Sequence, residues 1–178
     1  MMCIIIILFV MLTIAAVTDL LFDKVYNEWV LIGVTCGLAG ALCNNGAEGL
    51  LWALISMTAP VILLYPLFVI GGLGAGDIKL LAAAGCFLPV KETITCLGIA
   101  FLIGAVLSLL KMAAEGNFLQ RIQYLLSYIL DVFKSGEWKL YEQDMQAAFP
   151  DRRRRNEGKI HFSLPILLSV AIYKGGVF

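Results

Sequence analysis

The sequence predicts an all-α, polytopic membrane protein with about six transmembrane helices and one cytoplasmic amphipathic helix. Apolar residues make up 61% of its 178 residues, whereas a soluble domain averages about 45–50%. Charged residues make up only 15%, where about 25% is usual, and the mean hydropathy is +0.91. A soluble domain of this size could not bury so much apolar surface, so membrane lipid is the expected surrounding. The net charge of zero gives no reason to expect a nucleic-acid partner.

Long runs without charged residues locate the expected spans. A helix that crosses a bilayer needs about 17–25 residues. Four runs reach that length, and two, at 80–90 and 160–173, are shorter. No basic segment precedes the first run, so we expect a retained span rather than a cleaved signal peptide. The prediction is a single membrane domain over 1–178, with spans near 1–18, 29–45, 50–70, 77–90, 93–111 and 160–175.

The distribution of lysine and arginine predicts the orientation. If the N-terminus lies outside, eleven of the thirteen basic residues fall in the segments 18–28, 71–79 and 111–159. Only Lys91 and Lys174 then lie on the other side. Cytoplasmic segments are enriched in basic residues, so we expect a multi-pass protein of the cell membrane with these three segments in the cytoplasm.

The loop 111–159 is the only sizeable soluble part that the sequence predicts. Its apolar residues between 118 and 133 recur at helical spacing, which is typical of an amphipathic helix. Such a helix is expected to lie on the inner membrane face or to pack against the bundle. No internal repeat and no second domain are evident.

Cysteine and histidine usage argues against a metal or redox centre. The five cysteines are scattered through apolar stretches and form no C-x-x-C pair, so buried small side chains are their simplest interpretation. His161 is the only histidine. It begins the last expected span, where an interface anchor is favoured over a base. Because a protein metal site needs several ligands, we expect no metal and no cofactor.

Two aspartates stand out because of where they fall. Asp19 ends the first expected span and Asp77 opens the fourth. Two crossings separate them, so both are expected on the cytoplasmic side. Paired carboxylates suit aspartyl hydrolysis, in which one accepts a proton from water and the other donates a proton to the scissile carbonyl oxygen. Each also has a plainer interpretation, Asp77 as a helix N-cap and Asp19 as a helix-end anchor. Asp23, beside Lys24 in a short solvated loop, is not expected to take part.

The segment before Asp77 is rich in glycine. Gly74 and Gly76 permit positive φ and the close approach of another backbone. An extended substrate strand could pair its main-chain groups with such a loop. Irregular backbone at membrane depth is tolerated only where it lines a cavity or is buried in protein. Lys79, which follows, has a plainer interpretation as a snorkelling residue at the interface.

Two motifs resemble those of type IV prepilin peptidases. The run Gly-Ala-Gly-Asp at 74–77, continued by Ile-Lys-Leu, resembles the family's G-x-G-D signature. Asp19, followed by Val25 and Asn27, resembles its D-x5-[IV]-P-N motif. Tyr26 stands where the family usually has proline, a departure that leaves this turn less rigid. The closing run 162–168 also fits, so the resemblance covers nearly the whole chain except 111–159.

The resemblance implies an aspartic endopeptidase that removes the leader peptide of type IV (Flp-like) prepilins or pseudopilins at the cytoplasmic membrane face. It implies Asp19 and Asp77 as the catalytic pair. The residues implied to bind substrate or shape the loop are Gly74, Gly76, Lys79 and Asn27. Two-domain members carry a cytoplasmic insert with paired C-x-x-C motifs and a methyltransferase activity. This chain has no such insert after its first span, so it resembles the peptidase-only form of tight-adherence pilus systems.

Two alternatives remain open at this point. Presenilin-like and signal-peptide-peptidase-like proteases also use a G-x-G-D aspartate, but they resemble a longer design with a later P-A-L motif, which does not occur here. The other alternative is a non-catalytic membrane subunit of a secretion or pilus machine. The sequence does not indicate which pilin is the substrate or what the oligomeric state is.

Overall fold

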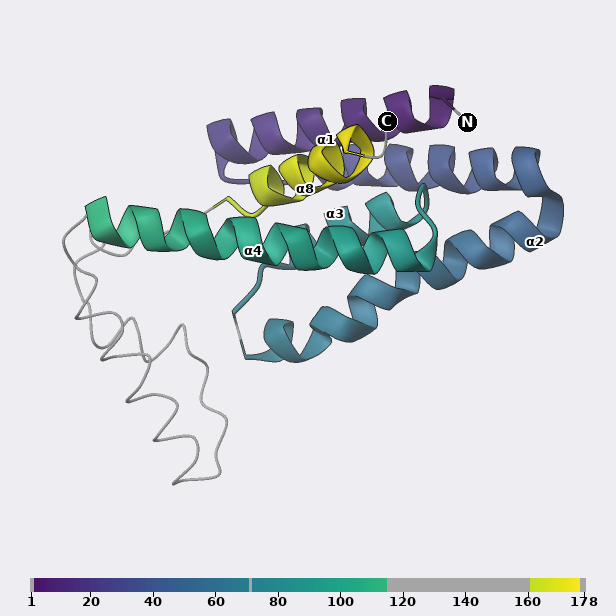
Figure 1. Ribbon diagram of the computed structural model, residues 1–178. Helices are drawn as coiled ribbons and strands as arrows, with labels where there is room; N and C mark the ends of the chain where they lie inside the picture. Colours follow the sequence, from purple (N-terminus) through teal and green to yellow (C-terminus); the bar gives the residue numbers. More distant parts are fainter. Residues whose placement is uncertain (1, 71, 115–160, 177–178) are drawn as a thin grey trace.

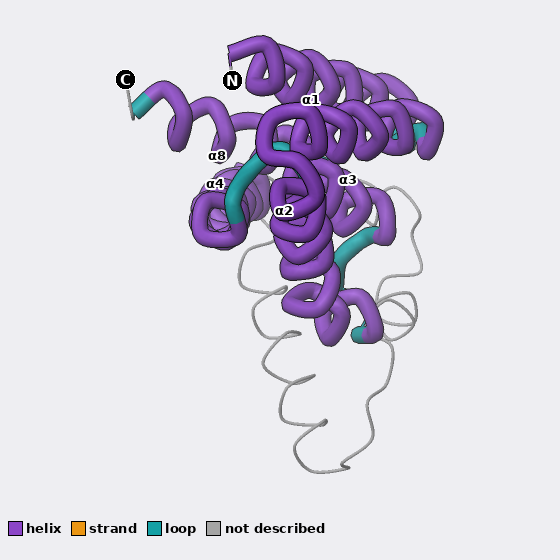
Figure 2. Tube along the Cα trace, turned by 90° about the vertical axis from the view of Figure 1, so that its right-hand side faces the viewer, coloured by secondary structure: helices purple, strands orange, loops and turns teal. Residues whose placement is uncertain are grey.

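The computed structural model describes residues 2–70, 72–114 and 161–176. All the regular structure in these ranges is helical, which confirms the all-α class (Figure 2). The helices are α1 (Met2–Phe22), α2 (Asn27–Val69), α3 (Ala75–Gly85), α4 (Val90–Ala114) and α8 (Ser163–Gly175) (Figure 1). The predicted amphipathic helix, and most of the loop 111–159 that contains it, lie outside the described residues.

Among the described residues, three helices are long and apolar enough to cross a membrane: Ile4–Phe22 in α1, Asn27–Val69 in α2, and Val90–Lys111 in α4. The chain therefore has the helices of a membrane protein, while the count of six spans stays a prediction. The fourth and sixth expected spans correspond to α3, with 11 residues, and α8, with 13. Both helices are shorter than the roughly 17–25 residues of a usual span.

The helix α2 contains a sharp break in its backbone. Its 43 residues would extend about 65 Å if straight, twice the roughly 30 Å of a bilayer core. At Gly46 the backbone is non-helical, with φ 61° and ψ −149°. Figure 1 shows α2 turning sharply there, so that its second arm runs back toward the end where the first began. The two arms, 27–45 and 47–69, cover the parts of the chain where the second and third spans are expected, and two separate crossings there stay a prediction.

Burial differs strongly between the long helices and α3. The long helices keep large apolar side chains exposed, as at Leu21, Ile62 and Leu102, which is how lipid-facing helices are composed. In contrast, seven of the eleven residues of α3 are buried. A Cβ added at Gly85 would lie 2.5 Å from the backbone oxygen of Ser56 in α2, so these two helices approach backbone to backbone. The short helix α3 is therefore the central element of the bundle.

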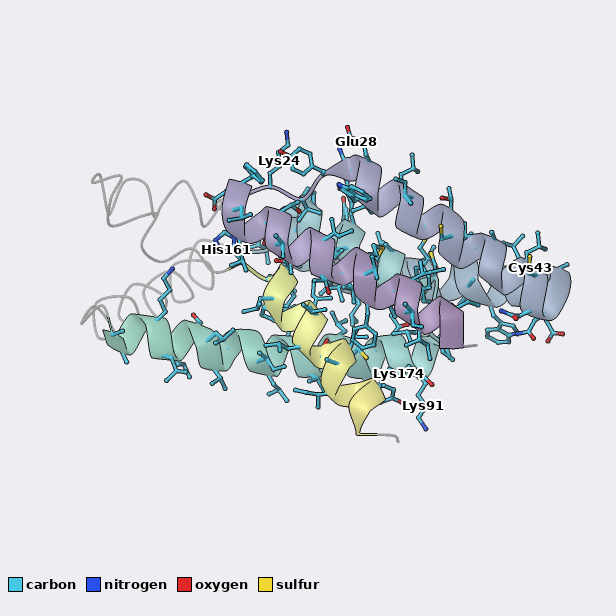
Figure 3. All side chains as sticks on the ribbon, turned by 90° about the horizontal axis from the view of Figure 1, so that it is seen from above. Lys24, Glu28, Cys43, Lys91, His161 and Lys174 are labelled. Atoms are coloured by element: carbon cyan, nitrogen blue, oxygen red, sulfur yellow. The ribbon has the colours of Figure 1, made fainter. Side chains whose placement is uncertain are left out.

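The directions of the helices gather five chain segments at one end of the molecule. The end of α1, the start of α2, the end of α4 and the start of α8 lie toward the same end in Figure 1. The start of α3 is tied to this group by a hydrogen bond from Lys79 to Asn27. Figure 3 places His161 at this end, and Lys91, Lys174 and Cys43 toward the opposite one. This arrangement brings the sequence motifs together.

Candidate active site

Asp19 lies in the last turn of α1 and is buried, with 8% of its surface exposed. A carboxylate at such a depth in an apolar helix is costly and points to function. The hydroxyl of Ser163, at the start of α8, donates a hydrogen bond of 2.6 Å to Oδ2 of Asp19. The Nδ1 atom of His161 lies 3.4 Å from the same oxygen, but without hydrogen-bond geometry. The start of α8 therefore holds Asp19 in place.

Asp23 has a different environment from Asp19. Its side chain is 66% exposed, compared with 12% for Asp19, and its Oδ1 lies 3.7 Å from Nε2 of His161. Its φ of 54° is the left-handed conformation that commonly ends a helix. The backbone N–H of Asp23 donates to the carbonyl oxygen of Asp19 at 2.9 Å. Asp23 is thus part of the C-terminal cap of α1, on the solvent side of Asp19.

Asp77 lies in the first turn of α3 and is partly buried. The N-cap of this helix is Gly74, so the interpretation of Asp77 as the N-cap residue is wrong. The backbone N–H of Asp77 donates to the carbonyl oxygen of Gly74 at 3.2 Å. A carboxylate in this turn faces the positive end of the helix dipole, which favours negative charge.

The glycines around Asp77 serve close approach rather than positive φ. Gly74 has φ −74°, and Gly46 is the only positive-φ glycine among the described residues, so neither Gly74 nor Gly76 uses the positive φ that glycine permits. A Cβ at Gly74 would lie 3.2 Å from Oδ2 of Asp77, and one at Gly76 would lie 3.4 Å from Val25. The absent side chains leave room for the carboxylate and for the neighbouring loop.

The two sequence motifs meet in the structure. Gly76 lies beside Val25, since a Cβ built at Gly76 would touch it, and Nζ of Lys79 donates to Oδ1 of Asn27 at 3.1 Å. Residues 25–27 therefore lie against 76–79, although about fifty residues separate them in the chain. Lys79 is exposed and bonded to a specific partner, which is more than a snorkelling lysine requires. The six predicted site residues thus lie on the elements that gather at one end of the bundle.

Sequence reasoning missed Ser163 and placed His161 only as an interface anchor. Ser163 begins α8, and His161 precedes it by two residues. The number of expected crossings puts the start of the last span on the same side of the membrane as Asp19, and this was the available indication. Among the described residues, no group of three or more His, Cys, Asp and Glu side chains is arranged to hold a metal.

A cavity of about 1000 Å³ lies elsewhere in the bundle. Its lining comes from the start of α1, the region of α2 around Gly46, the segment between α3 and α4, and the start of α4. It also includes Glu92 and Lys174, which form an ion pair of 2.6 Å. None of the predicted site residues lines it, so this cavity is separate from the candidate active site.

Comparison with known proteins gives one family match. The model of the type IV leader peptidase family matches residues 6–109, more than half of the chain. The matched range contains Asp19, Asp77 and the loops that carry them, but not α8. No curated protein and no solved structure matches the chain significantly.

Proposed function

Since the chain belongs to the type IV leader peptidase family, we propose that it is an aspartic endopeptidase with Asp19 and Asp77 as its catalytic pair. Its substrates are the leader peptides of type IV (Flp-like) prepilins or pseudopilins. The observation that carries the proposal is the meeting of the two aspartate motifs, through Val25 with Gly76 and Asn27 with Lys79. These contacts lie at the same end of the bundle as the buried carboxylate of Asp19.

The proposed reaction divides two tasks between the carboxyl groups. One carboxylate accepts a proton from water, whose oxygen attacks the scissile carbonyl carbon, while the other carboxylic acid donates a proton to the carbonyl oxygen. Two such groups near each other share a proton because both cannot ionise together at low cost. The carboxyl group that accepted the proton from water then donates it to the nitrogen of the leaving amine, and the C–N bond breaks.

The loop before Asp77 is the proposed substrate platform. Gly74 forms the N-cap with extended backbone, and extended backbone can pair with an extended peptide. The lack of side chains at Gly74 and Gly76 leaves space for a narrow chain next to the carboxylate of Asp77. This geometry favours a small substrate residue before the cleaved bond.

The membrane arrangement completes the proposal. We place six crossings along the chain, with α2 contributing two, and put the active-site end in the cytoplasm of a cell whose inner or plasma membrane holds the protein. This orientation puts eleven basic residues in the cytoplasm: Lys24, and ten others from Lys79 onward. The positive-inside rule favours it, because cytoplasmic segments are enriched in lysine and arginine. A prepilin leader is basic and cytosolic, so its cleavage site would meet the dyad at this face. No methyltransferase activity is proposed.

The decisive experiment is co-expression with a candidate prepilin. The wild-type chain should shift the prepilin to its mature mobility, and Asp77→Asn should abolish the shift while the protein still reaches the membrane. Glu28→Gln removes a charge at the same end, on the first turn of α2, and serves as the matched control that should process normally. Full processing by the Asp77→Asn variant would favour a non-catalytic subunit.

A further inference from the structure

The start of α8 contacts the proposed catalytic machinery from outside the family match. The match ends at residue 109, whereas Ser163 lies 144 positions after Asp19 and donates to it at 2.6 Å. Ser163 is fully buried, with 0% of its surface exposed. A short hydrogen bond from a hydroxyl to a carboxylate is among the stronger kinds in proteins.

We propose that Ser163 is a positioning residue for Asp19. Among the described residues, both contacts to the Asp19 carboxylate, from Ser163 and from His161, fall on Oδ2. The hydroxyl therefore fixes one carboxylate oxygen and leaves Oδ1 for proton exchange with water or substrate. This inference rests on the proposed function and extends it to a part of the chain that the family match does not cover.

A serine suits this task in both protonation states of the dyad. A hydroxyl donates one hydrogen bond and accepts others, and its hydrogen rotates to suit the partner. It can donate to Asp19 as a carboxylate and accept from it as a carboxylic acid, so Asp19 keeps its orientation when its proton moves. His161 is less suited to holding it, because its Nδ1 makes no hydrogen bond in the structure.

The packing of α8 gives Ser163 a fixed base. Pro165 and Ile166, which follow it, are buried. The ring of Phe162 lies 5.1 Å from that of Phe101 in α4, centroid to centroid. A Cβ at Gly104 would approach Phe162 to 2.9 Å, so only glycine there lets α4 come this close. Because the first turn of α8 is packed in this way, the Ser163 hydroxyl has little freedom to move, and it restricts the orientation of the Asp19 carboxyl group.

The helix itself provides a matched control. Ser169 is also on α8 and also 0% exposed, but its hydroxyl donates to the carbonyl oxygen of Ile166 in its own helix, at 2.8 Å. Ser163→Ala and Ser169→Ala therefore remove the same atom from equally buried places, and only the first removes a contact with Asp19.

The test measures kcat and KM for cleavage of a prepilin by the full chain in detergent micelles. A hydrogen bond to a charged group, when lost, corresponds to a change of about 10- to 100-fold. We expect Ser163→Ala to lower kcat by about that factor with KM within about twofold, and Ser169→Ala to leave both within about twofold. Equal kinetics for the two variants would overturn the inference, as would a loss in Ser163→Ala that is confined to KM.

Two further variants complete the experiment. If Ser163→Ala does not fold, Ser163→Cys fills the site with a slightly larger side chain of the same connectivity and a weaker donor, and should show a reduced kcat; wild-type kcat in that variant would overturn the inference. Asp19→Asn, assayed beside these variants, separates the two proposals. Activity in Asp19→Asn would contradict the proposed function itself, whereas an inactive Asp19→Asn with a fully active Ser163→Ala would contradict only the role of Ser163.

Discussion

Replacing Asp19 and Asp23 separately by asparagine distinguishes two acids that lie one helical turn apart. Asparagine keeps the shape of aspartate but removes its charge and its capacity to exchange a proton. The structure gives the two positions opposite environments. The Asp19 side chain is 12% exposed and accepts a hydrogen bond from Ser163, whereas the Asp23 side chain is 66% exposed. In Asp19→Asn the amide oxygen can still accept the hydrogen bond from Ser163, so the variant should fold.

The expected magnitudes follow from these environments. Asp19→Asn removes one half of the proposed dyad, whose mechanism needs both carboxyl groups, so turnover should fall by about 1000-fold or more, equivalent to about 4 kcal/mol of activation free energy. Asp23→Asn weakens an exposed pairing with His161 at 3.7 Å. Such pairs contribute about 0–1 kcal/mol, so activity should fall by no more than about fivefold.

The assay is cleavage of a prepilin by purified protein in detergent micelles, with circular dichroism and thermal melting to establish that both variants are folded. An inactive Asp23→Asn together with an active Asp19→Asn would refute the reasoning, because it would pair Asp77 with the exposed acid. Comparable losses in both variants would show that burial does not distinguish their roles.

Three other outcomes are expected. A bulky residue in place of the small one before the cleaved bond should block processing on a gel, and normal processing would argue against the narrow platform at Gly74 and Gly76. Pilin matured by the purified chain alone should carry an unmodified N-terminus in mass spectrometry, and an added methyl group would contradict the peptidase-only proposal. Lys79→Ala and Asn27→Ala should each lower kcat/KM by about 2- to 10-fold. Their double variant should be no worse than either single change, since both remove one 3.1 Å contact; fully additive losses would contradict that coupling.

The fold class and the long helices follow from composition, because about twenty apolar residues in a row have one stable arrangement in lipid. The sequence therefore predicts α1 and α4 within a few residues of their observed bounds. The short helices are less predictable. α3 covers 75–85 where 77–90 is expected, since the apolar run continues past the end of the helix at Gly85. The burial of α3 depends on the helices that pack around it, and the local sequence pattern of α3 does not indicate them.

In the candidate site, too, some features follow from the local sequence and others depend on the tertiary structure. Asp19 and Asp77 can be found from sequence because each carries its charge at the edge of a long apolar run. Ser163 cannot be found in this way, because a serine at the start of an apolar helix is ordinary and its partner lies 144 residues away. The alternative interpretation of Asp77 as an N-cap is wrong, because Gly74, three residues earlier, begins the helix with extended backbone. These facts depend on tertiary contacts and on local dihedral angles.

The break in α2 shows how one backbone angle affects the arrangement of the whole chain. Gly46 combines φ 61° with ψ −149°, a region that is essentially restricted to glycine and costs other residues about 1–3 kcal/mol. Gly98 in α4 is the matched control, because nothing lies within 4 Å of a Cβ built at either position but Gly98 lies within a regular helix. Gly46→Ala should lower the free energy of unfolding by about 1–3 kcal/mol, whereas Gly98→Ala should raise it by up to about 1 kcal/mol. Thermal melting in one detergent compares the two directly. Equal shifts would mean that α2 does not need its glycine to turn.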